Sequence, residues 1–549
     1  MKSAAAASSL GMMKPVEVFA ERARKTTGYF GVHPFVEDHP EAVFVMFTDV
    51  DVKTNEKACE REGKNFAGEI IIPKDNSGIP VSHMVPIKPN ITGGGGNTYE
   101  TMGIITDPHF VGGMIESMKD LGISKKNFHL REVNCVNWKK HVYHPVARST
   151  GADLHNMNGR VEGIDNERLS QWSRNNDTID NSELQWVDVP HGIIYRKIPY
   201  LWPINAPDTF LLNIAKFKAH SMGLTLCCKN FQGAVANGYQ HFCQKMGSVM
   251  TLPAEHRNPN VERDVETCMK RHVATLPRWD RPVKKDNDPA WTQVDTYDTV
   301  CQEIWSHRTL DSLSVTKFGL HIVEGIYARD GNFSRGPNPE GNEDNPRGTA
   351  WDYMTNIVIF GRDPFRVDLV GKWLGGHEPG NFGFFHIAME RGMLNVMNPM
   401  NIPVYHWQNG HAVKKPLTWF TRTPLKTYYL QKENEPFWHL VNEPFDYRTV
   451  DEERPVYPSR PGTRILTQGC QTASYPFMAI EYSIPDTGNV MLEILNDKGE
   501  TLTVPVNAER ERGCHLASWN TADYDSGDYA YRFRFNDYSE TGKIRLRKS

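Results

Sequence analysis

Apolar and polar residues follow one another in blocks that alternate between strand and helix patterns over most of the chain. Residues 84–91 are largely apolar and predict a buried strand, and a helical pattern then begins after Asp107 and stops near Gly122. A second strand is predicted at residues 128–133. Strand, helix and strand in this order form a βαβ unit, which places two parallel strands in one sheet.

Two further passages repeat this order of elements. Residues 209–219 predict a strand, and residues 224–236 predict the helix that follows it. The apolar strand at 356–360 leads into a helix for which Asp363 is well placed as the N-cap. Repeated alternation of this kind predicts an α/β fold with a mostly parallel sheet flanked by helices.

After Pro476 the pattern changes to a period of two, which is typical of half-buried strands. Five short strands are predicted at hairpin spacing, at residues 479–484, 490–495, 501–506, 514–519 and 529–535. A tight turn at 496–499 joins two of these strands. The regular spacing predicts a small C-terminal β-sandwich.

These changes of pattern divide the chain into four parts. Residues 1–30 are a remnant export signal or a disordered tail, and residues 31–407 form the α/β domain. Residues 408–474 are rich in proline and aromatic side chains and predict a partly packed connector, and residues 475–549 form the β-sandwich.

Composition excludes several classes of function. The chain of 549 residues has 62 Lys plus Arg and 66 Asp plus Glu, so its net charge is −4. Without a basic stripe such a chain does not attract nucleic acid, and no apolar run reaches the roughly 18 residues that a transmembrane helix needs. Nine cysteines occur without a C-x-x-C pair, which disfavours a zinc or iron–sulfur cage.

The densest group of polar residues lies in the segment NIAKFKAHSMGLTLCCKNFQG, residues 213–233. On a strand, Lys216, Lys218 and His220 share one face because side chains alternate with a period of two. Open α/β sheets bind ligands at the carboxyl ends of their strands, and the positive N-terminus of the next helix, near Thr225, adds to the attraction of an anion. We therefore predict a site for a small anionic ligand; the alternative is that the lysines solvate a sheet edge.

Residues from several turns are assigned to this site. Lys218, His220 and Lys229 are the catalytic candidates, because burial beside like charge shifts a pKa toward neutrality. The candidate ligand-binding residues are Lys88, Asn90, Lys216, Thr225, Asn230, Glu324 and Asp363. The βα turns of a parallel sheet open at one edge, so we expect Lys88 and Lys218 to lie at the same end of the sheet.

The need for a metal or cofactor stays open. His386 and Glu390 lie four residues apart on a predicted helix, so they can bind one metal ion or pair with each other. The run Gly93–Gly96 lets backbone N–H groups approach a ligand, yet it matches neither the P-loop nor the dinucleotide-binding pattern. It is a weak phosphate cradle or a plain loop, and the cofactor is unknown.

The order of the motifs resembles a known family, the domain of unknown function 362. The motifs are IKPNI at 87–91, TDPHFV at 106–111, the Lys-x-Lys-x-His and Lys-Asn-x-x-Gly segment at 213–233, HIVEGIYARDG at 321–331 and FGRDPFRVD at 360–368. The resemblance covers roughly residues 40–400. It implies no activity, and the ferredoxin cysteines that many members carry are missing here, so the resemblance does not support electron transfer.

Both ends of the chain carry weaker resemblances. Residues 481–500 and 526–546 are similar to flagellar hook-capping-type immunoglobulin-like domains, some of which are type IX secretion sorting signals. The start MKSAAAASSLGMM resembles a twin-arginine signal that begins after its arginine pair, or it is a short cytosolic tail. Together these resemblances imply a bacterial protein in the periplasm or at the cell surface, whose C-terminal domain contacts export machinery.

Two functions from different classes follow. The first is an exported enzyme that acts on a small anionic or carbohydrate-like substrate through Lys218, His220 and Lys229. The second is a non-catalytic surface protein that uses the same cations only for capture, and a redox or metal-dependent enzyme is a third. Substitution of Lys229 separates the first two, since it should abolish turnover in an enzyme but only weaken binding in a capture protein.

Overall fold

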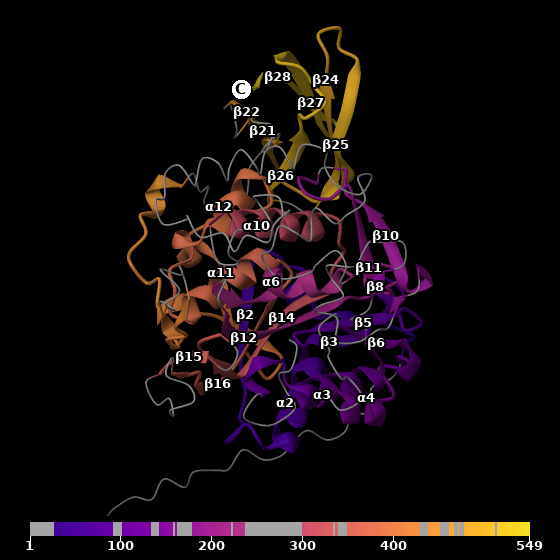
Figure 1. The fold of residues 1–549 in the computed structure, drawn as a ribbon. Helices are drawn as coiled ribbons and strands as arrows, with labels where there is room; N and C mark the ends of the chain where they lie inside the picture. The colour runs from indigo at the N-terminus through magenta and orange to yellow at the C-terminus, as the bar shows by residue number, and fades with distance from the viewer. Residues whose placement is uncertain are drawn as a thin grey trace, which may run out of the picture.

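The structure is a computed structural model in which a central sheet with helices on both faces carries a smaller group of strands at one end (Figure 1). It describes residues 27–91, 102–132, 142–156, 160–161, 178–179, 181–190, 192–220, 223–236, 299–332, 335–338, 348–428, 438–450, 461–465, 470–471, 477–510 and 513–548. Among these residues, no helix is both long enough and apolar enough to cross a bilayer.

The central sheet is mixed and mostly parallel. In spatial order its strands are β18 (His411–Lys414), β17 (Val404–Gln408), β2 (Val43–Phe47), β16 (Asp352–Gly361), β14 (Leu320–Arg329), β12 (Leu212–His220), β5 (Val85–Pro89), β6 (Phe128–Glu132) and β7 (Asp153–Asn156), and β13 (Gly223–Thr225) pairs with β12. From β14 to β7 all neighbours along this path are parallel. The predicted α/β class is therefore confirmed.

The direction of β16 differs from the prediction. The strand at 356–360 was expected to extend the parallel alternation, but β16 runs antiparallel to both β14 and β2. The register pairs Arg329 with Asp352, so the connection from β14 to β16 begins and ends at the same edge of the sheet. A chain that turns back at one edge returns antiparallel, because no crossover carries it to the other end.

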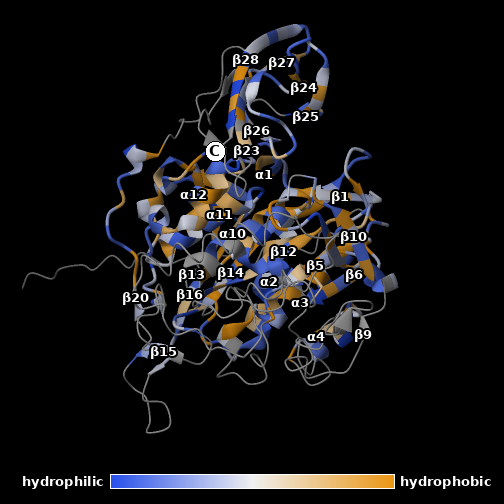
Figure 2. Ribbon diagram, turned by 45° about the horizontal axis from the view of Figure 1, so that its top comes forward, coloured by the Kyte–Doolittle hydropathy of each residue, from blue (hydrophilic) through white to orange (hydrophobic). Residues whose placement is uncertain are grey.

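Helices cover both faces of this sheet and bury two separate apolar clusters (Figures 1 and 2). One face carries α2 (Glu56–Ile70), α3 (Pro108–Lys119) and α4 (Tyr143–Thr150), and the other carries α6 (Cys227–Phe231), α10 (Thr299–Ser314), α11 (Pro364–Leu374) and α12 (Gly383–Glu390). On the first face α2 and α3 touch backbone to backbone: a Cβ on Gly63 would lie 2.0 Å from the carbonyl oxygen of Phe110. Glycine is needed there because any side chain would separate the helices.

Two Asp-Pro pairs start helices on opposite faces. The Asp107 carboxylate accepts hydrogen bonds from the backbone N–H groups of His109 and Phe110 at 2.8 and 3.0 Å, and Pro108 occupies the first turn of α3. Asp363 caps α11 in the same way. Both predicted caps are confirmed, because capping depends only on residues next to one another in sequence.

Short strands form small sheets around the central one. They are β1 (Tyr29–Val32) with β3 (Ile71–Lys74) and β4 (Ile79–Pro80), β10 (Leu184–Asp188) with β11 (Lys197–Leu201), β8 (Arg160–Val161) with β9 (Thr178–Ile179), and β19 (Thr427–Tyr428) with β20 (Trp438–His439). β19 contacts the functional site, because the Thr427 hydroxyl donates to the carbonyl oxygens of His220 and Gly223.

The C-terminal strands form two further sheets that share one buried cluster. The first sheet holds β21 (Gly462–Ile465), β23 (Phe477–Ile484) and β26 (Gly513–Asn520), and the second holds β22 (Cys470–Gln471), β28 (Tyr538–Lys548), β27 (Gly527–Phe535), β24 (Gly488–Leu495) and β25 (Thr501–Arg510). All five predicted strands are present. β28 was not predicted, since its sequence is mostly polar and only Ile544 and Leu546 are buried in the cluster.

The segment predicted as a connector, 408–474, supplies strands to both parts of the molecule. β18 is the edge strand of the central sheet, whereas β21 and β22 pair with strands of the C-terminal sheets. The predicted export signal or tail at 1–30 lies almost entirely outside the described residues, which begin at Thr27. The described residues of the C-terminal sheets begin at residue 461.

Candidate functional site

The candidate site lies where β12 extends beyond its neighbour β5. The last register pair between these parallel strands joins Ile214 to Pro89, so β12 continues past the end of β5. β13 folds back on this extension and pairs Thr225 with Lys218 and Gly223 with His220. Gly223 has φ +95°, a left-handed conformation that glycine adopts without strain. The β12–β13 hairpin therefore places the polar residues at the end of β12 next to the start of α6.

On the α6 side, Lys88, Asn90 and Asn230 form one hydrogen-bonded group. Lys88 Nζ donates to Glu132 Oε2 at 2.6 Å and to Asn230 Oδ1 at 3.2 Å. Asn90 Nδ2 donates to the same Asn230 oxygen at 3.1 Å, and Asn230 Nδ2 donates to Asn213 Oδ1 at 2.9 Å. Burial lowers the pKa of Lys88, and the Glu132 carboxylate opposes this shift. Lys88 is thus a buried ammonium with a carboxylate partner.

Glu132 was not assigned to the site from the sequence. It ends β6, the strand predicted at 128–133, so its place at the carboxyl end of the neighbouring strand was a usable signal. A Cβ on Gly233 would lie 2.4 Å from Glu132 Oε1 and 2.9 Å from Lys88 Cε. The glycine of the Lys-Asn-x-x-Gly motif therefore leaves room for the Lys88–Glu132 pair.

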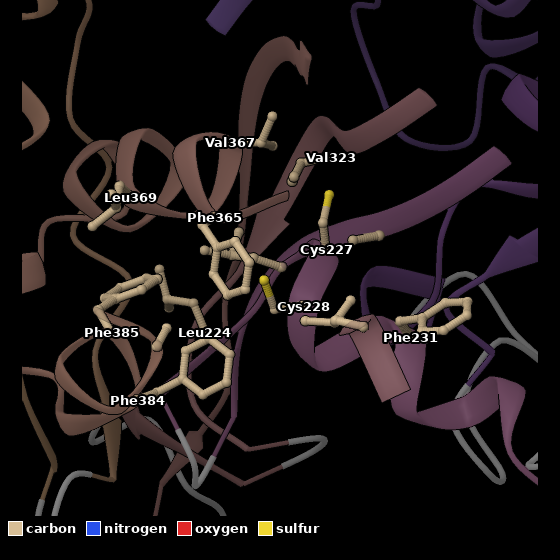
Figure 3. Packing of buried hydrophobic residues seen from close by; sticks show 14 of the residues in the cluster. Leu224, Cys227, Cys228, Phe231, Val323, Phe365, Val367, Leu369, Phe384 and Phe385 are labelled. Carbon is tan, nitrogen blue, oxygen red and sulfur yellow. The ribbon is translucent and has the colours of Figure 1, made fainter. Parts of the chain in front are cut away.

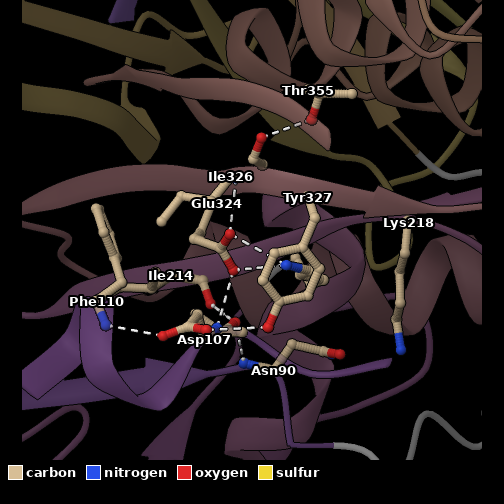
Figure 4. Close-up of polar contacts among 12 residues, drawn as sticks. Asn90, Asp107, Phe110, Ile214, Lys218, Glu324, Ile326, Tyr327 and Thr355 are labelled. Carbon is tan, nitrogen blue, oxygen red and sulfur yellow. Dashed lines mark hydrogen bonds and ion pairs between the residues drawn. The ribbon is translucent and has the colours of Figure 1, made fainter. Parts of the chain in front are cut away.

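On the other face, Lys216 and Glu324 form a second buried ion pair, and Figure 4 shows Glu324 between Asp107 and Ile326. Lys216 Nζ lies 3.0 and 2.9 Å from the two carboxylate oxygens, and both side chains have no exposed surface. The backbone N–H groups of Asp107 and Ile326 donate to the same carboxylate, each at 2.9 Å. Tyr327 covers Lys216, whose Nζ is 3.6 Å from the ring centroid. Protein groups surround both charges, so each of them already has its partner within the sheet.

Lys218, His220 and Lys229, which we call the cationic centre, lie at the end of the β12 extension and on α6. Their residues are 3, 5 and 7 % exposed. Lys218 Nζ donates to the carbonyl oxygen of Ile104 at 2.5 Å and stands apart from the Glu324 network in Figure 4. Within the described part of the chain, Lys229 makes no hydrogen bond or ion pair. Lys229 is therefore a buried residue whose ammonium group has no counter-charge from the residues that the structure describes.

The electrostatics of the cationic centre keep its histidine neutral. Burial, followed by the charges of Lys229 and Lys218, holds the pKa of His220 well below its usual value of 6.5. The charge of Lys229 also lowers the pKa of Lys88. Lys229 is therefore close to both the histidine and the amide group, and it links the two halves of the predicted site.

A helix N-terminus does lie close to Thr225, as predicted, but a carboxylate of the protein occupies it. Thr225 ends β13, and its buried hydroxyl has no hydrogen-bond partner among the described residues. α6 begins at Cys227 and is five residues long. Its first two N–H groups, from Cys227 and Cys228, donate to the two oxygens of Asp368 at 2.7 and 2.9 Å. A carboxylate from α11 therefore takes the place that was expected for a ligand.

Asp363 lies away from the cationic centre. Its carboxylate accepts from the N–H groups of Phe365 and Arg366 at 2.8 and 3.2 Å. It follows β16, whose last residue, Gly361, pairs with His321 near the start of β14. The cationic centre lies beyond the other end of the parallel strands, so Asp363 is placed as a helix cap and not beside the other candidates.

Sequence reasoning missed Lys372, which faces the same region from α11. Its Nζ is buried without a hydrogen-bond partner in the described structure, and it lies 3.9 Å from the centroid of the Phe382 ring. Burial lowers the pKa of Lys372 to about 7, although Asp368 opposes the shift. Burial likewise raises the pKa of Asp368 to about 7. A single lysine in the apolar stretch FRVDLVGKWL was the available signal.

A small cavity joins Lys372 to the cationic centre. Its volume is about 10 Å³, close to what one water molecule needs. The lining residues are Leu224, Leu226, Cys228, Lys229, Trp305, Asp368, Lys372, Phe382, Phe384 and Phe385. Figure 3 shows the apolar part of this wall, where Leu224, Cys228 and Phe384 gather between α6 and the helices α11 and α12. Lys229 and Lys372 thus line the same largely apolar cavity.

The remaining candidates for metal and ligand binding are the His386–Glu390 pair, the cysteines and the glycine run. The described residues contain no group of three or more His, Cys, Asp or Glu side chains arranged for a metal ion. His386 Nε2 contacts the carbonyl oxygen of Gly380 at 2.7 Å. Cys59, Cys227 and Cys228 are buried free thiols. The glycine run at 93–96 lies outside the described residues.

A comparison with sequence families bears on the whole of this site. The sequence model of the family described as a domain of unknown function (DUF362) matches residues 85–372, over half of the chain. The chain belongs to this family. The DUF362 match begins at the first residue of β5 and ends at Lys372, so it includes the amide group, the cationic centre and the cavity lysine.

Comparisons with individual proteins add nothing on function. None of the curated proteins compared with the chain matches it. Among the matching solved structures is an engineered protein that is 9% identical, with a TM-score of 0.13, and the match covers 17% of this chain and 21% of that protein. A likeness this small carries no argument about the fold.

Proposed function

We propose that this DUF362 protein is an enzyme that acts on a small anionic substrate bound at the cationic centre. The observation that carries the proposal is Lys229, a buried residue that lines a cavity and has no counter-charge among the described residues. Burying an unpaired charge costs several kcal/mol, by an order-of-magnitude estimate. A carboxylate or phosphate group would supply the missing charge, so such a ligand fits this place better than a neutral one.

The roles of the three residues follow from their charges. Lys229 binds the anion, and Lys218, held by the carbonyl oxygen of Ile104, adds positive charge beside it. His220 is neutral at pH 7 because burial and both ammonium groups oppose its protonation. A neutral imidazole accepts a proton, so His220 is the general base, and the lysines stabilise negative charge that develops on the substrate.

Anion binding is tested by thermal unfolding of the full chain in increasing concentrations of inorganic phosphate. A ligand that binds only the folded state raises Tm with its concentration. We expect the wild type to respond and Lys229→Gln to lose the response. Lys126→Gln is the matched control. Lys126 is exposed and precedes β6, so it lies at the amino ends of the parallel strands, opposite the cationic centre. An equal response from Lys229→Gln and the wild type would refute the site.

The competing function is non-catalytic capture of the same anion. It is favoured by the same uncompensated charge at Lys229, since capture needs no general base. His220→Gln separates the two functions in a screen of small carboxylates, phosphates and sugar acids, with products followed by NMR. An enzyme loses roughly 10²–10⁴-fold in turnover and keeps its phosphate response, whereas a capture protein shows no turnover before the substitution.

We also propose that the protein is exported to the periplasm or the cell surface and that the C-terminal sheets act in sorting. Support comes from the resemblance of residues 481–500 and 526–546 to sorting domains and from the buried cluster that the C-terminal sheets share. Fractionation of cells that produce the full chain, or a chain without residues 461–549, tests this. Recovery of the full chain only from the cytosol would refute export.

A further inference from the structure

Lys372 is the buried lysine to which the proposed function gives no role. It lies in the last turn of α11, is 1% exposed, and has no hydrogen-bond partner among the described residues. Phe382 lies against its Nζ, and Gly223 of the β12–β13 hairpin is close enough that a Cβ there would be 3.3 Å from the same atom. The lysine is thus held against an aromatic ring and a glycine rather than by a polar partner.

The surroundings favour an uncharged amine. The cavity wall next to Lys372 is mostly apolar or aromatic, and its charged or titratable members are Lys229 and Cys228 from α6 and Asp368 from α11 itself. Asp368 does not reach ion-pair distance, since its two oxygens accept from the N–H groups that begin α6. A lysine that is desolvated beside another cation is the arrangement that activates amine nucleophiles in proteins.

The cavity comes nearest to solvent at Phe382. Of its lining residues, Phe382 alone is partly exposed, and the rest are buried. Its volume of about 10 Å³ holds one water, so a ligand must displace that water and move the Phe382 ring. Only a compact group fits, and a carbonyl group next to a carboxylate is among the smallest organic groups that offer one function to each of the two lysines.

We propose that Lys372 is an amine nucleophile that forms a Schiff base with the carbonyl carbon of a small oxo acid, whose carboxylate is bound by Lys229. The anion half of this proposal rests on the proposed function. In the step, the uncharged Lys372 nitrogen adds to the carbonyl carbon to give a carbinolamine. The carbonyl oxygen then leaves as water with the two protons of the amine, and a C=N bond remains, so no oxidant or reductant is needed.

The resulting imine explains why the two lysines differ in their surroundings. A protonated imine withdraws electrons from the neighbouring carbon and makes its C–H bond acidic. A neutral His220 can then accept the proton of that C–H bond as a base. Lys229 binds the carboxylate, and Lys372, whose pKa is lowered by burial, acts as the nucleophile. One cavity therefore contains a binding lysine and a reacting lysine.

The experiment is reductive trapping on the full chain near pH 7, with sodium cyanoborohydride and either glyoxylate or acetaldehyde as the probe. At this pH an amine of pKa about 7 is uncharged in about half of the molecules, against roughly one in several thousand for an ordinary lysine. We expect peptide mass spectrometry to find the carboxymethyl group from glyoxylate on Lys372 at least tenfold above exposed lysines. Equal labelling of Lys372 and exposed lysines, or labelling of Lys229 instead, overturns the proposal.

Matched variants separate this proposal from the anion site. In Lys229→Gln, glyoxylate labelling of Lys372 should fall about tenfold while labelling by uncharged acetaldehyde stays the same. If phosphate still raises Tm but Lys372 remains unlabelled by both probes, the nucleophile is refuted and the anion site stands. If acetaldehyde labels Lys372 and glyoxylate has no advantage, the oxo-acid assignment is refuted. Lys372→Arg and Lys372→Met identify the labelled residue, and circular dichroism checks that each variant is folded.

Discussion

Of the five buried lysines among the described residues, four fall into two pairs that differ in how their charge is balanced. Lys88 and Lys216 each have a carboxylate oxygen within 3.0 Å, whereas Lys229 and Lys372 have no ion-pair partner among the described residues and line one cavity. A paired buried charge contributes to the scaffold, and an unpaired one lowers stability. The unpaired lysines are therefore the better candidates for a functional role, because their burial without a counter-charge does not stabilise the fold.

The largest expected effect comes from breaking a paired lysine. Lys216→Met leaves the Glu324 carboxylate buried without its partner, so we expect the free energy of unfolding to fall by about 3–5 kcal/mol. Urea unfolding followed by circular dichroism measures this. The double variant Lys216→Met with Glu324→Gln should recover most of the loss, because no charge then remains buried. A loss below about 1 kcal/mol in the single variant would mean that the pair does not need its lysine.

The same substitution at an unpaired lysine should have the opposite sign. Lys372→Met removes a buried amine whose pKa falls from 10.5 to about 7 on folding, so the variant should gain up to about 4 kcal/mol at pH 7. The unfolded wild type binds more protons between these two pKa values, so wild-type stability rises as pH increases from 7 to 10.5. The difference in unfolding free energy between the variant and the wild type is therefore largest at or below pH 7 and disappears above pH 10. Urea unfolding across this pH range measures the difference in stability between the variant and the wild type. A difference that does not change with pH would contradict the assignment of Lys372 as an unpaired buried amine.

A glycine next to a paired lysine sharpens the comparison on a smaller scale. The Cβ in Gly233→Ala would press on Glu132 Oε1 and Lys88 Cε, so we expect a loss of about 1–3 kcal/mol in unfolding free energy. The control is Gly383→Ala in the first turn of α12, where a Cβ meets nothing within 4 Å and the change should be neutral or slightly stabilising. Equal effects at the two positions would show that the Lys88–Glu132 pair is not tightly packed.

Asp363 provides a change in stability that is separate from the cationic centre. Asp363→Ala removes the N-cap of α11, so the expected loss is about 1 kcal/mol by thermal or urea unfolding. The phosphate-dependent rise in Tm should be unchanged, because the cap lies at the other end of the parallel strands. Loss of the phosphate response in this variant would place Asp363 in the site after all.

Removal of the C-terminal sheets should have the smallest effect on the site. Their buried cluster is separate from the two clusters of the central sheet, so a chain without residues 461–549 should keep the phosphate response of the full chain. Circular dichroism first establishes that the shortened chain is folded. If it is folded and phosphate no longer raises Tm, the C-terminal sheets take part in binding.

Local pattern was enough to predict much of the architecture. The strand–helix order and the caps at Asp107 and Asp363 depend on residues close together in the sequence, as do the tight turn at 496–499 and the five C-terminal strands. The group of Lys88, Asn90 and Asn230 also follows from the rule that parallel strands end at one edge. Such features need only periodicity and short-range hydrogen bonds.

The charge state of each lysine was decided by the tertiary structure alone. Lys216 and Glu324 lie 108 residues apart, and only the register of β12 against β14 places them opposite each other. Asp368 caps α6 across a similar separation, which displaced the ligand expected there and left Lys372 without an ion pair. The sequence determined where cations concentrate; the packing of distant elements decided which of them are neutralised, because burial and counter-charge are properties of neighbours in space.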